Sequence, residues 1–194
     1  MSLKDGPSDL ELMQRISSKD LSALELLYAR YSPIIYTLVK KIITDRTTAD
    51  EVLIEVFEII WTKINFFDFQ TSNVYTWIIT LARNKAIDSI RRSRNAEMKS
   101  YDLEYEREFI IPKLSRLIDP LDLATSDKIS PTLSKAMNNL TEAQKFVISL
   151  SYYEGLTEQE IASRLNIPLQ TVKHKIKVAL NNLKENLLKD NSYE

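Results

Sequence analysis

The stretch that decides the fold is TEQEIASRLNIPLQTVKHKIKVALNNL, residues 157–183. It begins with Thr157 and Glu160, which have the spacing of a capping box at the start of a short helix. Asn166 follows in a turn and tolerates the left-handed backbone that tight turns often need. The segment therefore predicts a helix-turn-helix. The expected buried stripe of its second, longer helix consists of Val172, Ile176, Leu180 and Leu183.

The opposite face of the longer helix is basic. No acidic residue lies between Ile161 and Lys184. A helix that enters the DNA major groove needs cations for phosphates and hydrogen-bond donors for base edges. The pattern therefore indicates DNA recognition, and the alternative is an ordinary helical hairpin with a solvated basic face. The polar residues of this face are Gln170, Lys173, His174 and Lys177, with Lys175 beside them.

Apolar spacing predicts four helices upstream, at roughly 20–31, 32–42, 47–63 and 74–92. The second is expected to begin at Ser32 and Pro33, which resemble an N-cap followed by a first-turn proline. The third is expected to begin at Thr47, because Asp50 stands at capping-box spacing from it.

The chain loses its helical period between Asn95 and Ser130, where prolines and acidic residues gather. We expect a linker there and a new helical region opening at Ser130 and Pro131. Downstream, Thr141 and Gln144 have capping-box spacing, and the residues expected to face inward are Phe146, Val147 and Leu150. The predicted fold is all-α, with two small helical domains at 8–95 and 130–190 joined by a linker at 96–129.

The composition excludes several classes of function. The 194 residues include two glycines and no cysteine, so a Gly-rich phosphate loop and a thiolate metal site are both ruled out. A single histidine excludes the usual multi-histidine metal sites, and no catalytic constellation is evident. We therefore expect no enzyme activity, metal or cofactor. Without a secretion signal or a long apolar run, the sequence favours the cytoplasm.

Two further patterns point to partners. Asn84, Asp88, Arg91 and Arg92 share one side of the predicted 74–92 helix, and aromatic residues precede them, as in sites that stack unpaired bases. Aromatic residues at helical spacing are more often core, which remains the alternative for Trp77 and for Phe57 on the preceding helix. A second pattern on that preceding helix is an acidic edge, which indicates a basic partner or a solvated face. This edge consists of Glu51, Glu55 and Glu58.

Taken together, these segments resemble the extracytoplasmic-function sigma factors. YARYSPIIYTLVKKI, TADEVLIEVFEIIW and FFDFQTSNVYTWIITLARNKAIDSIRR are similar to the second conserved region of that family. LTEAQKFVISLSYYEGLTEQEIASRLNIPLQTVKHKIKVALNNLKENL is similar to the fourth. The resemblance implies a transcription initiation factor that binds core RNA polymerase and promoter DNA, with no small-molecule substrate. It also implies an anti-sigma factor, often membrane-bound, as a partner.

The resemblance assigns a role to three groups of residues. Those that dock on core polymerase are Asp50, Glu51, Ile54, Glu55, Phe57 and Glu58, with Trp61 on the same helix. Those that recognise and open the minus-ten element are Phe67, Asn73, Trp77, Asn84, Lys85, Asp88, Arg91 and Arg92. Those that read the minus-thirty-five element are Gln170, Thr171, Lys173, His174, Lys175, Lys177 and Val178. Departures from the family pattern include Ile54, where Gln is usual, and His174, where a small Ser is common.

Two alternatives come from other classes of protein. One is a helix-turn-helix regulator that never joins polymerase, and the other is an interaction protein that occupies polymerase without opening DNA. A separate expectation concerns apolar residues in the linker, which we predict to pack against a domain or a partner. These residues are Phe109, Ile110, Ile111, Leu114, Leu117, Ile118 and Leu121.

Overall fold

The computed structural model describes residues 6–70, 72–94 and 123–190, and all of the regular structure in these ranges is helical. The chain divides into two units, Met1–Asp122 and Leu123–Glu194. This confirms the predicted all-α class. The apolar residues 109–121, whose packing was predicted, lie outside the described residues.

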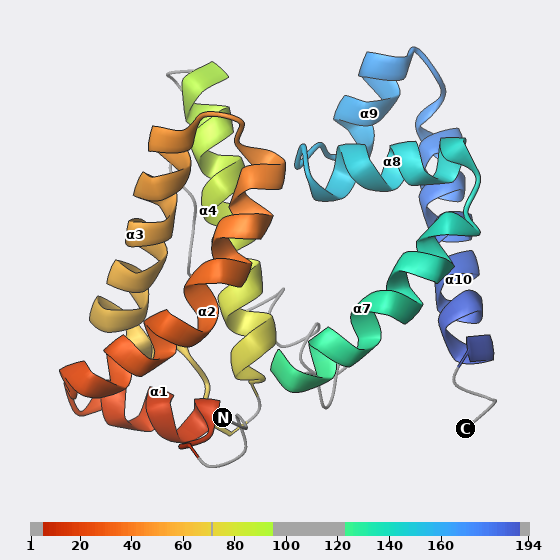
Figure 1. The fold of residues 1–194 in the computed structure, drawn as a ribbon. Coiled ribbons are helices and arrows are strands. Elements are labelled where there is room, and N and C mark those ends of the chain that lie inside the picture. The colour runs from red at the N-terminus through yellow and green to blue at the C-terminus, as the bar shows by residue number, and fades with distance from the viewer. Residues whose placement is uncertain (1–5, 71, 95–122, 191–194) are drawn as a thin grey trace. The chain divides into compact units, whose positions relative to one another are not determined.

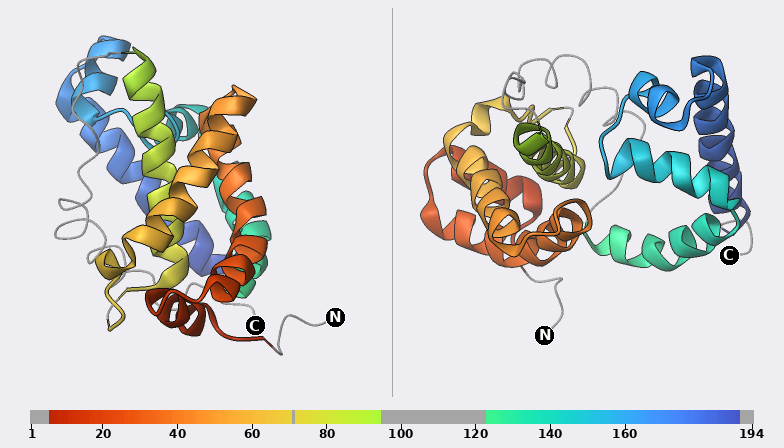
Figure 2. Two further views of the ribbon diagram at one scale, coloured as in Figure 1. Left: turned by 90° about the vertical axis from the view of Figure 1, so that its left-hand side faces the viewer. Right: turned by 90° about the horizontal axis from the view of Figure 1, so that it is seen from above.

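The described residues of the first unit form four helices and one short 3-10 turn. Helices α2, α3 and α4 pack against one another, and α1 packs against α2 and the near end of α4 (Figures 1 and 2). The buried core lies between them and includes Leu27, Tyr31, Val56, Ile60 and Ile78. The elements are α1 (Asp9–Ser17), α2 (Leu21–Ile42), α3 (Arg46–Thr62), η1 (Ile64–Phe66) and α4 (Val74–Arg94).

Two predicted helix starts in this unit are wrong. The expected break at Ser32 and Pro33 does not occur, because α2 runs through Pro33 as one helix. A proline inside a helix costs about 3 kcal/mol, and the continuous buried stripe of α2 offsets that cost. The stripe consists of Ala23, Leu27, Tyr31, Ile35, Val39 and Ile42.

Helix α3 begins one residue before the predicted start at Thr47. Its N-cap is Asp45, whose Oδ2 accepts hydrogen bonds from the Thr48 backbone N–H and the Thr48 hydroxyl, both at 2.7 Å. An aspartate is among the strongest N-caps, so it takes precedence over the capping box expected at Thr47.

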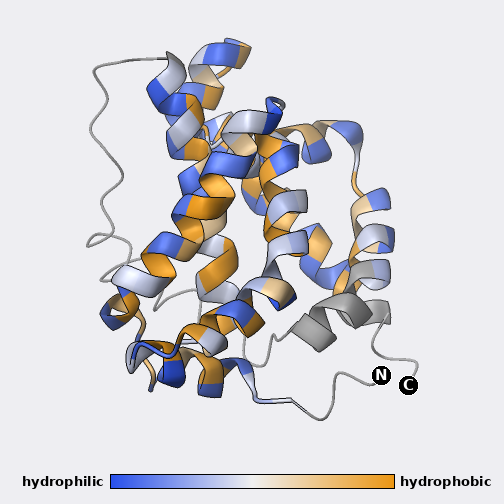
Figure 3. Cartoon of the chain, turned by 60° about the vertical axis from the view of Figure 1, so that its left-hand side comes forward, coloured by the Kyte–Doolittle hydropathy of each residue, from blue (hydrophilic) through white to orange (hydrophobic). Residues whose placement is uncertain are grey.

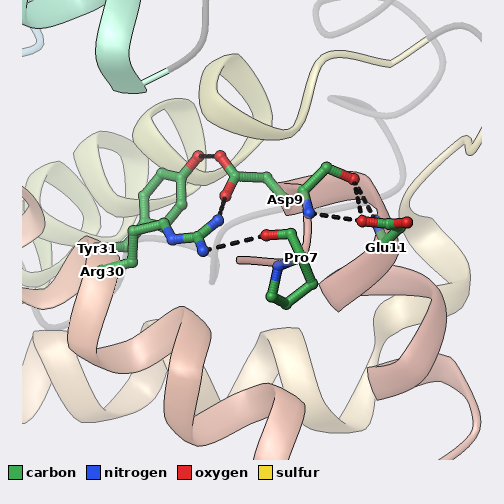
Figure 4. Close-up of polar contacts among 6 residues, drawn as sticks. Pro7, Asp9, Glu11, Arg30 and Tyr31 are labelled. Carbon is green, nitrogen blue, oxygen red and sulfur yellow. Dashed lines mark hydrogen bonds and ion pairs between the residues drawn. The ribbon is translucent and has the colours of Figure 1, made fainter. Parts of the chain in front are cut away.

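A polar clasp holds α1 against α2 (Figure 4). The Asp9 carboxylate pairs with the Arg30 guanidinium and accepts a hydrogen bond from the Tyr31 hydroxyl. Arg30 Nη2 also donates to the Pro7 carbonyl oxygen at 3.1 Å. Burial and the neighbouring Asp9 carboxylate raise the pKa of Tyr31 well above its ordinary value. The tyrosine therefore stays a neutral hydrogen-bond donor.

The second unit contains α7 (Leu123–Asn138), α8 (Glu142–Tyr152), α9 (Glu158–Leu165) and α10 (Leu169–Asp190). Helix α10 packs against each of the other three. The small core lies between α8, α9 and α10 and consists of Leu150, Ile161, Ala162 and Val172. Hydrophobic and hydrophilic residues alternate along the helices, as expected of helices packed on one side (Figure 3).

Helix α7 corrects the predicted opening of this unit. It begins at Leu123, inside the expected linker, and continues through Pro131 instead of starting there. Proline fits the first turn of a helix, whereas inside a helix it costs about 3 kcal/mol, so the local signal favoured a start at Pro131. Helix α7 nevertheless continues through Pro131.

The helix-turn-helix is confirmed in detail. Thr157 and Glu160 form a capping box, and Asn166 has left-handed backbone angles of φ 51° and ψ 47°. Two expected inward side chains are instead exposed, namely Phe146 and Leu180, the latter at 52%. On this part of α10 Ala179 is buried in place of Leu180, and its small side chain lets the helix approach its neighbours closely.

Candidate protein and nucleic-acid interfaces

The outer edge of α3 is acidic and partly apolar. Asp50, Glu51 and Glu58 are exposed, and Ile54 between them is 64% exposed. A single exposed apolar side chain is common on protein surfaces, but Ile54 lies among carboxylates on the same helix, so the edge combines charge with one apolar contact. The edge can meet a partner that is basic with an apolar contact at its centre.

Two residues predicted for the same edge face inward. The Phe57 ring is buried, with its centroid 4.7 Å from that of Tyr28. Glu55 Oε2 lies 3.1 Å from Lys85 Nζ and 3.9 Å from Arg92 Nη2, both on α4. Neither pairing had a signal in the local sequence.

The loop before α4 is held by aromatic packing. Phe67 is buried and meets Phe69 and Trp77 edge-on, with ring centroids 5.0 and 5.5 Å away. Asn73 Oδ1 accepts a hydrogen bond from the Thr76 backbone N–H at 2.9 Å, as an N-cap does. The core alternative therefore holds for Trp77 and Phe57 in this structure. Phe67, which was expected in the base-binding loop, is buried as well.

Helix α4 carries the predicted polar row at its C-terminal half. Asn84 is buried, and its Oδ1 accepts a hydrogen bond from Arg83 Nη1 at 3.0 Å. Asp88 Oδ2 lies 3.3 Å from Arg92 Nε, one turn further along. Arg91 is half-buried and Arg92 is exposed, so cationic surface remains available at this end of the helix.

The basic face of α10 is open to solvent. Gln170, Lys173, His174 and Lys177 are exposed, whereas Thr171, Lys175 and Val178 are half-buried beside them. The first turn of α9 brings Glu158 Oε2 to 4.0 Å from Lys173 Nζ. This neighbour was missed, because Glu158 lies outside the stretch of α10 and only the fold brings it close. The face otherwise suits a polyanion.

Among the described residues, no group of three or more His, Cys, Asp or Glu side chains is arranged to hold a metal ion. None of the helices in residues 6–70, 72–94 and 123–190 combines the length and apolar character needed to cross a bilayer.

Comparison with known proteins decides the family. Residues 27–96 match the family model of Sigma-70 region 2, and residues 136–185 match that of Sigma-70, region 4. The chain is 28% identical over 169 residues to the ECF RNA polymerase sigma factor RpoE of Cereibacter sphaeroides, covering 87% of this chain and 88% of that relative. The chain belongs to the extracytoplasmic-function sigma factors. Another relative of this sigma factor is SigK of Mycobacterium tuberculosis, 26% identical over 178 residues, with 91% and 92% of the two chains covered.

Two solved structures resemble this sigma factor. Rhodobacter sphaeroides SigE in complex with the anti-sigma ChrR is 27% identical, with a TM-score of 0.45 and 91% of this chain and 96% of that one covered. CnrH in complex with the cytosolic domain of CnrY is 18% identical, with a TM-score of 0.40 and coverage of 94% and 98%.

Membership of this family establishes the general activity. The sigma factor is a transcription initiation factor that joins core RNA polymerase and directs it to promoters, and it is not an enzyme. The region 2 match removes the alternative of a helix-turn-helix regulator that never joins polymerase.

Proposed function

We propose that the outer edge of α3 docks this sigma factor on core RNA polymerase. Exposed Asp50, Glu51 and Glu58 supply charge for a basic partner surface, and Ile54 supplies an apolar contact among them. Charge complementarity favours fast and specific association, whereas burial of the apolar Ile54 in the complex favours a long-lived one. Phe57, behind this edge, supports it through its contact with Tyr28.

The second part of the proposal assigns the minus-ten element to α4 and the loop before it. Arg91 and Arg92 supply cations for the phosphate backbone. Asn73 fixes the start of α4, and buried Asn84 fixes its polar row. Buried Phe67 and Trp77 hold the loop before α4 in shape. Asp88 pairs with Arg92 and sets its position. An unpaired base of the opened strand would bind at this rigid loop.

The third part assigns the minus-thirty-five element to α10. Lys173, His174 and Lys177 are exposed on one face of the second helix of a helix-turn-helix, which is the element that enters the major groove in this motif. Gln170 and Thr171 lie at its N-terminal end, while Lys175 and Val178 border the same face. These residues supply both phosphate contacts and donors to base edges.

One observation carries the assignment most directly. A single helical unit holds an exposed acidic edge on α3 and a cationic end on α4, while a separate unit carries the helix-turn-helix. Such an arrangement has separate surfaces for a basic protein and for two stretches of DNA. The formal net charge of -1 gives the free chain little overall attraction to DNA, so we expect specific DNA binding only together with core polymerase.

The partners follow from this function. We propose that the sigma factor acts in the cytoplasm, where core polymerase and chromosomal DNA are found. SigE of Rhodobacter sphaeroides, 27% identical to this chain, was solved in complex with the anti-sigma ChrR, and we propose an anti-sigma factor as a further partner here.

Transcription by bare core polymerase tests the proposal. The purified chain, mixed with core polymerase, is expected to start RNA synthesis from a promoter of its native host and to give none without polymerase. The variant Glu51→Lys is expected to lower polymerase affinity. Glu25→Lys, at an exposed position of α2, serves as the charge-matched control. A chain that binds core polymerase but never initiates would instead be an interaction protein that only occupies polymerase.

A further inference from the structure

One carboxylate of α3 faces α4 instead of the outer edge. Glu55 Oε2 lies 3.1 Å from Lys85 Nζ and 3.9 Å from Arg92 Nη2, and Arg92 Nε lies 3.3 Å from Asp88 Oδ2. Lys85, Asp88 and Arg92 stand three and four residues apart, so they line the same side of α4. The four side chains form a chain of alternating charge across the α3–α4 contact.

Burial makes this network different from a surface ion pair. The side chain of Lys85 is only 17% exposed and that of Asp88 only 12%. The Oε2 atom of Glu55 is shielded from solvent and makes no hydrogen bond of regular geometry, so its interaction with the two cations is chiefly electrostatic. Glu55 and Arg92 are more exposed, at 38% and 47%, but a lysine on a mostly buried stem that lacks a nearby counter-charge is destabilising to the extent that its ammonium group loses hydration. Lys85 therefore depends on Glu55.

We propose that Glu55 is a positioning residue for the DNA-facing helix and not a polymerase contact. It neutralises Lys85 inside the α3–α4 contact and, together with Asp88, holds the Arg92 guanidinium in place. Arg92 is exposed and has five N–H donors, so it can bind a phosphate while these carboxylates hold it. The inference rests on the proposed role of α4 at the minus-ten element.

The assignment separates Glu55 from its neighbours on the same helix. Asp50, Glu51 and Glu58 are exposed and remain the docking carboxylates, whereas Glu55 acts through α4. It also removes Lys85 from the phosphate-binding residues, since its side chain is mostly buried and its ammonium group pairs with Glu55. The helix that meets polymerase and the helix that meets DNA are thus joined through Glu55, which pairs with both Lys85 and Arg92.

Variants at the two ends of the pair test the inference in the full chain with core polymerase. Glu55→Gln is expected to keep its affinity for core polymerase within about twofold, because the docking edge is intact. With polymerase saturated, opening of a duplex promoter is expected to slow by roughly tenfold, as Lys85 and Arg92 lose their anchor. Lys85→Arg should retain opening, whereas Lys85→Met should impair it.

Two further measurements separate positioning from direct DNA contact. The double variant Glu55→Gln, Lys85→Met should open the promoter no more slowly than Glu55→Gln alone, because the residues act as one unit. Lys85→Met should leave the salt dependence of promoter binding unchanged, whereas loss of a true phosphate contact would reduce the log–log slope by about one. Glu25→Gln, at an exposed position of α2, controls for the loss of one negative charge.

Three results would overturn the inference while leaving the proposed function intact. These are additive effects in the double variant, a reduced salt slope for Lys85→Met, or a Glu55→Gln defect that is confined to polymerase affinity and matches that of Glu51→Gln. A wild-type chain that binds core polymerase but opens no promoter would overturn the role of α4 itself, and this inference with it.

Discussion

Lys19 and Trp61 join the turn after α1 to the end of α3. Lys19 Nζ donates a hydrogen bond to the Trp61 carbonyl oxygen at 2.7 Å and lies 5.0 Å from the centroid of the indole ring. The last carbonyl groups of a helix lack hydrogen-bond partners within the helix and carry partial negative charge. A lysine there supplies both a hydrogen-bond donor and a positive charge. Lys19 reaches this position from a left-handed backbone with φ 63°.

This contact predicts a graded effect of substitutions at Lys19. Lys19→Ala is expected to lower the free energy of unfolding by about 1 to 2 kcal/mol from the lost contact, while it keeps the left-handed strain that a residue with a Cβ, lysine included, carries at this position. Lys19→Gly loses the same contact without that strain and should cost less. Urea denaturation followed by tryptophan fluorescence measures the first unit alone, since Trp61 and Trp77 both lie in it. Equal losses in the two variants would contradict the strained turn.

The Tyr31 hydroxyl predicts an alkaline loss of stability. Burial and Asp9 raise the pKa of Tyr31 in the folded chain above its unfolded value, which is about 10. Below pH 10 both states are neutral at this group and its stabilising effect is complete. Above pH 10 the unfolded state ionises first, so the free energy of unfolding should fall as pH rises. Tyr31→Phe should be less stable at neutral pH and lose less between pH 9 and pH 11, as measured by urea denaturation.

The N-cap of α3 predicts an acid effect of the opposite sign. The Thr48 backbone N–H, and then the Thr48 hydroxyl, hold the pKa of Asp45 below its ordinary value. The stabilisation is therefore present above the unfolded pKa of about 3.9 and is lost as pH falls through the lower folded value. Asp45→Asn keeps a capping oxygen but cannot titrate, so its stability should decline less below pH 4. A steeper decline in Asp45→Asn than in the wild type would contradict this account.

The turn of the helix-turn-helix predicts opposite outcomes for two small residues. Asn166 has φ 51°, a region that glycine enters freely and alanine does not. Asn166→Ala should destabilise the second unit by about 1 kcal/mol, whereas Asn166→Gly should be nearly neutral. Hydrogen exchange of α9 and α10 in the full chain checks this without interference from the first unit. Faster exchange in both variants alike would mean that the Asn166 side chain, not its backbone, stabilises the turn.

The exposed face of α10 predicts a change in sequence preference. His174→Ala should cost about 1 to 3 kcal/mol on its preferred upstream element and relax the choice at one base pair. Transcription from a pre-melted bubble template by the holoenzyme should remain unchanged. Lys184→Ala, further along α10 and also exposed, is a control for loss of a polar side chain from this helix. Retention of the wild-type preference by His174→Ala would contradict base reading at that position.

How well the position of each expected functional residue could be predicted depends on how far along the chain its contacting residues lie. Exposure of Lys173, His174 and Lys177 could be predicted, since each belongs to the polar face of one amphipathic helix. The inward positions of Trp77 and Phe57 could be given only as alternatives, because an aromatic residue at helical spacing fits both a core and a binding surface. The burial of Phe67, in a loop, had no such signal.

The sequence by itself determined the helical class, the capping boxes at Thr141 and Thr157, and the left-handed turn at Asn166. Each of these depends on groups within a few residues of one another, so local spacing is sufficient. Only the tertiary structure decided that α2 continues through Pro33, that Ala179 and not Leu180 is buried, and that Glu55 pairs with Lys85. These outcomes depend on which helix packs against which face. The packing energies between helices distant in sequence exceed the local propensities that the sequence pattern reports.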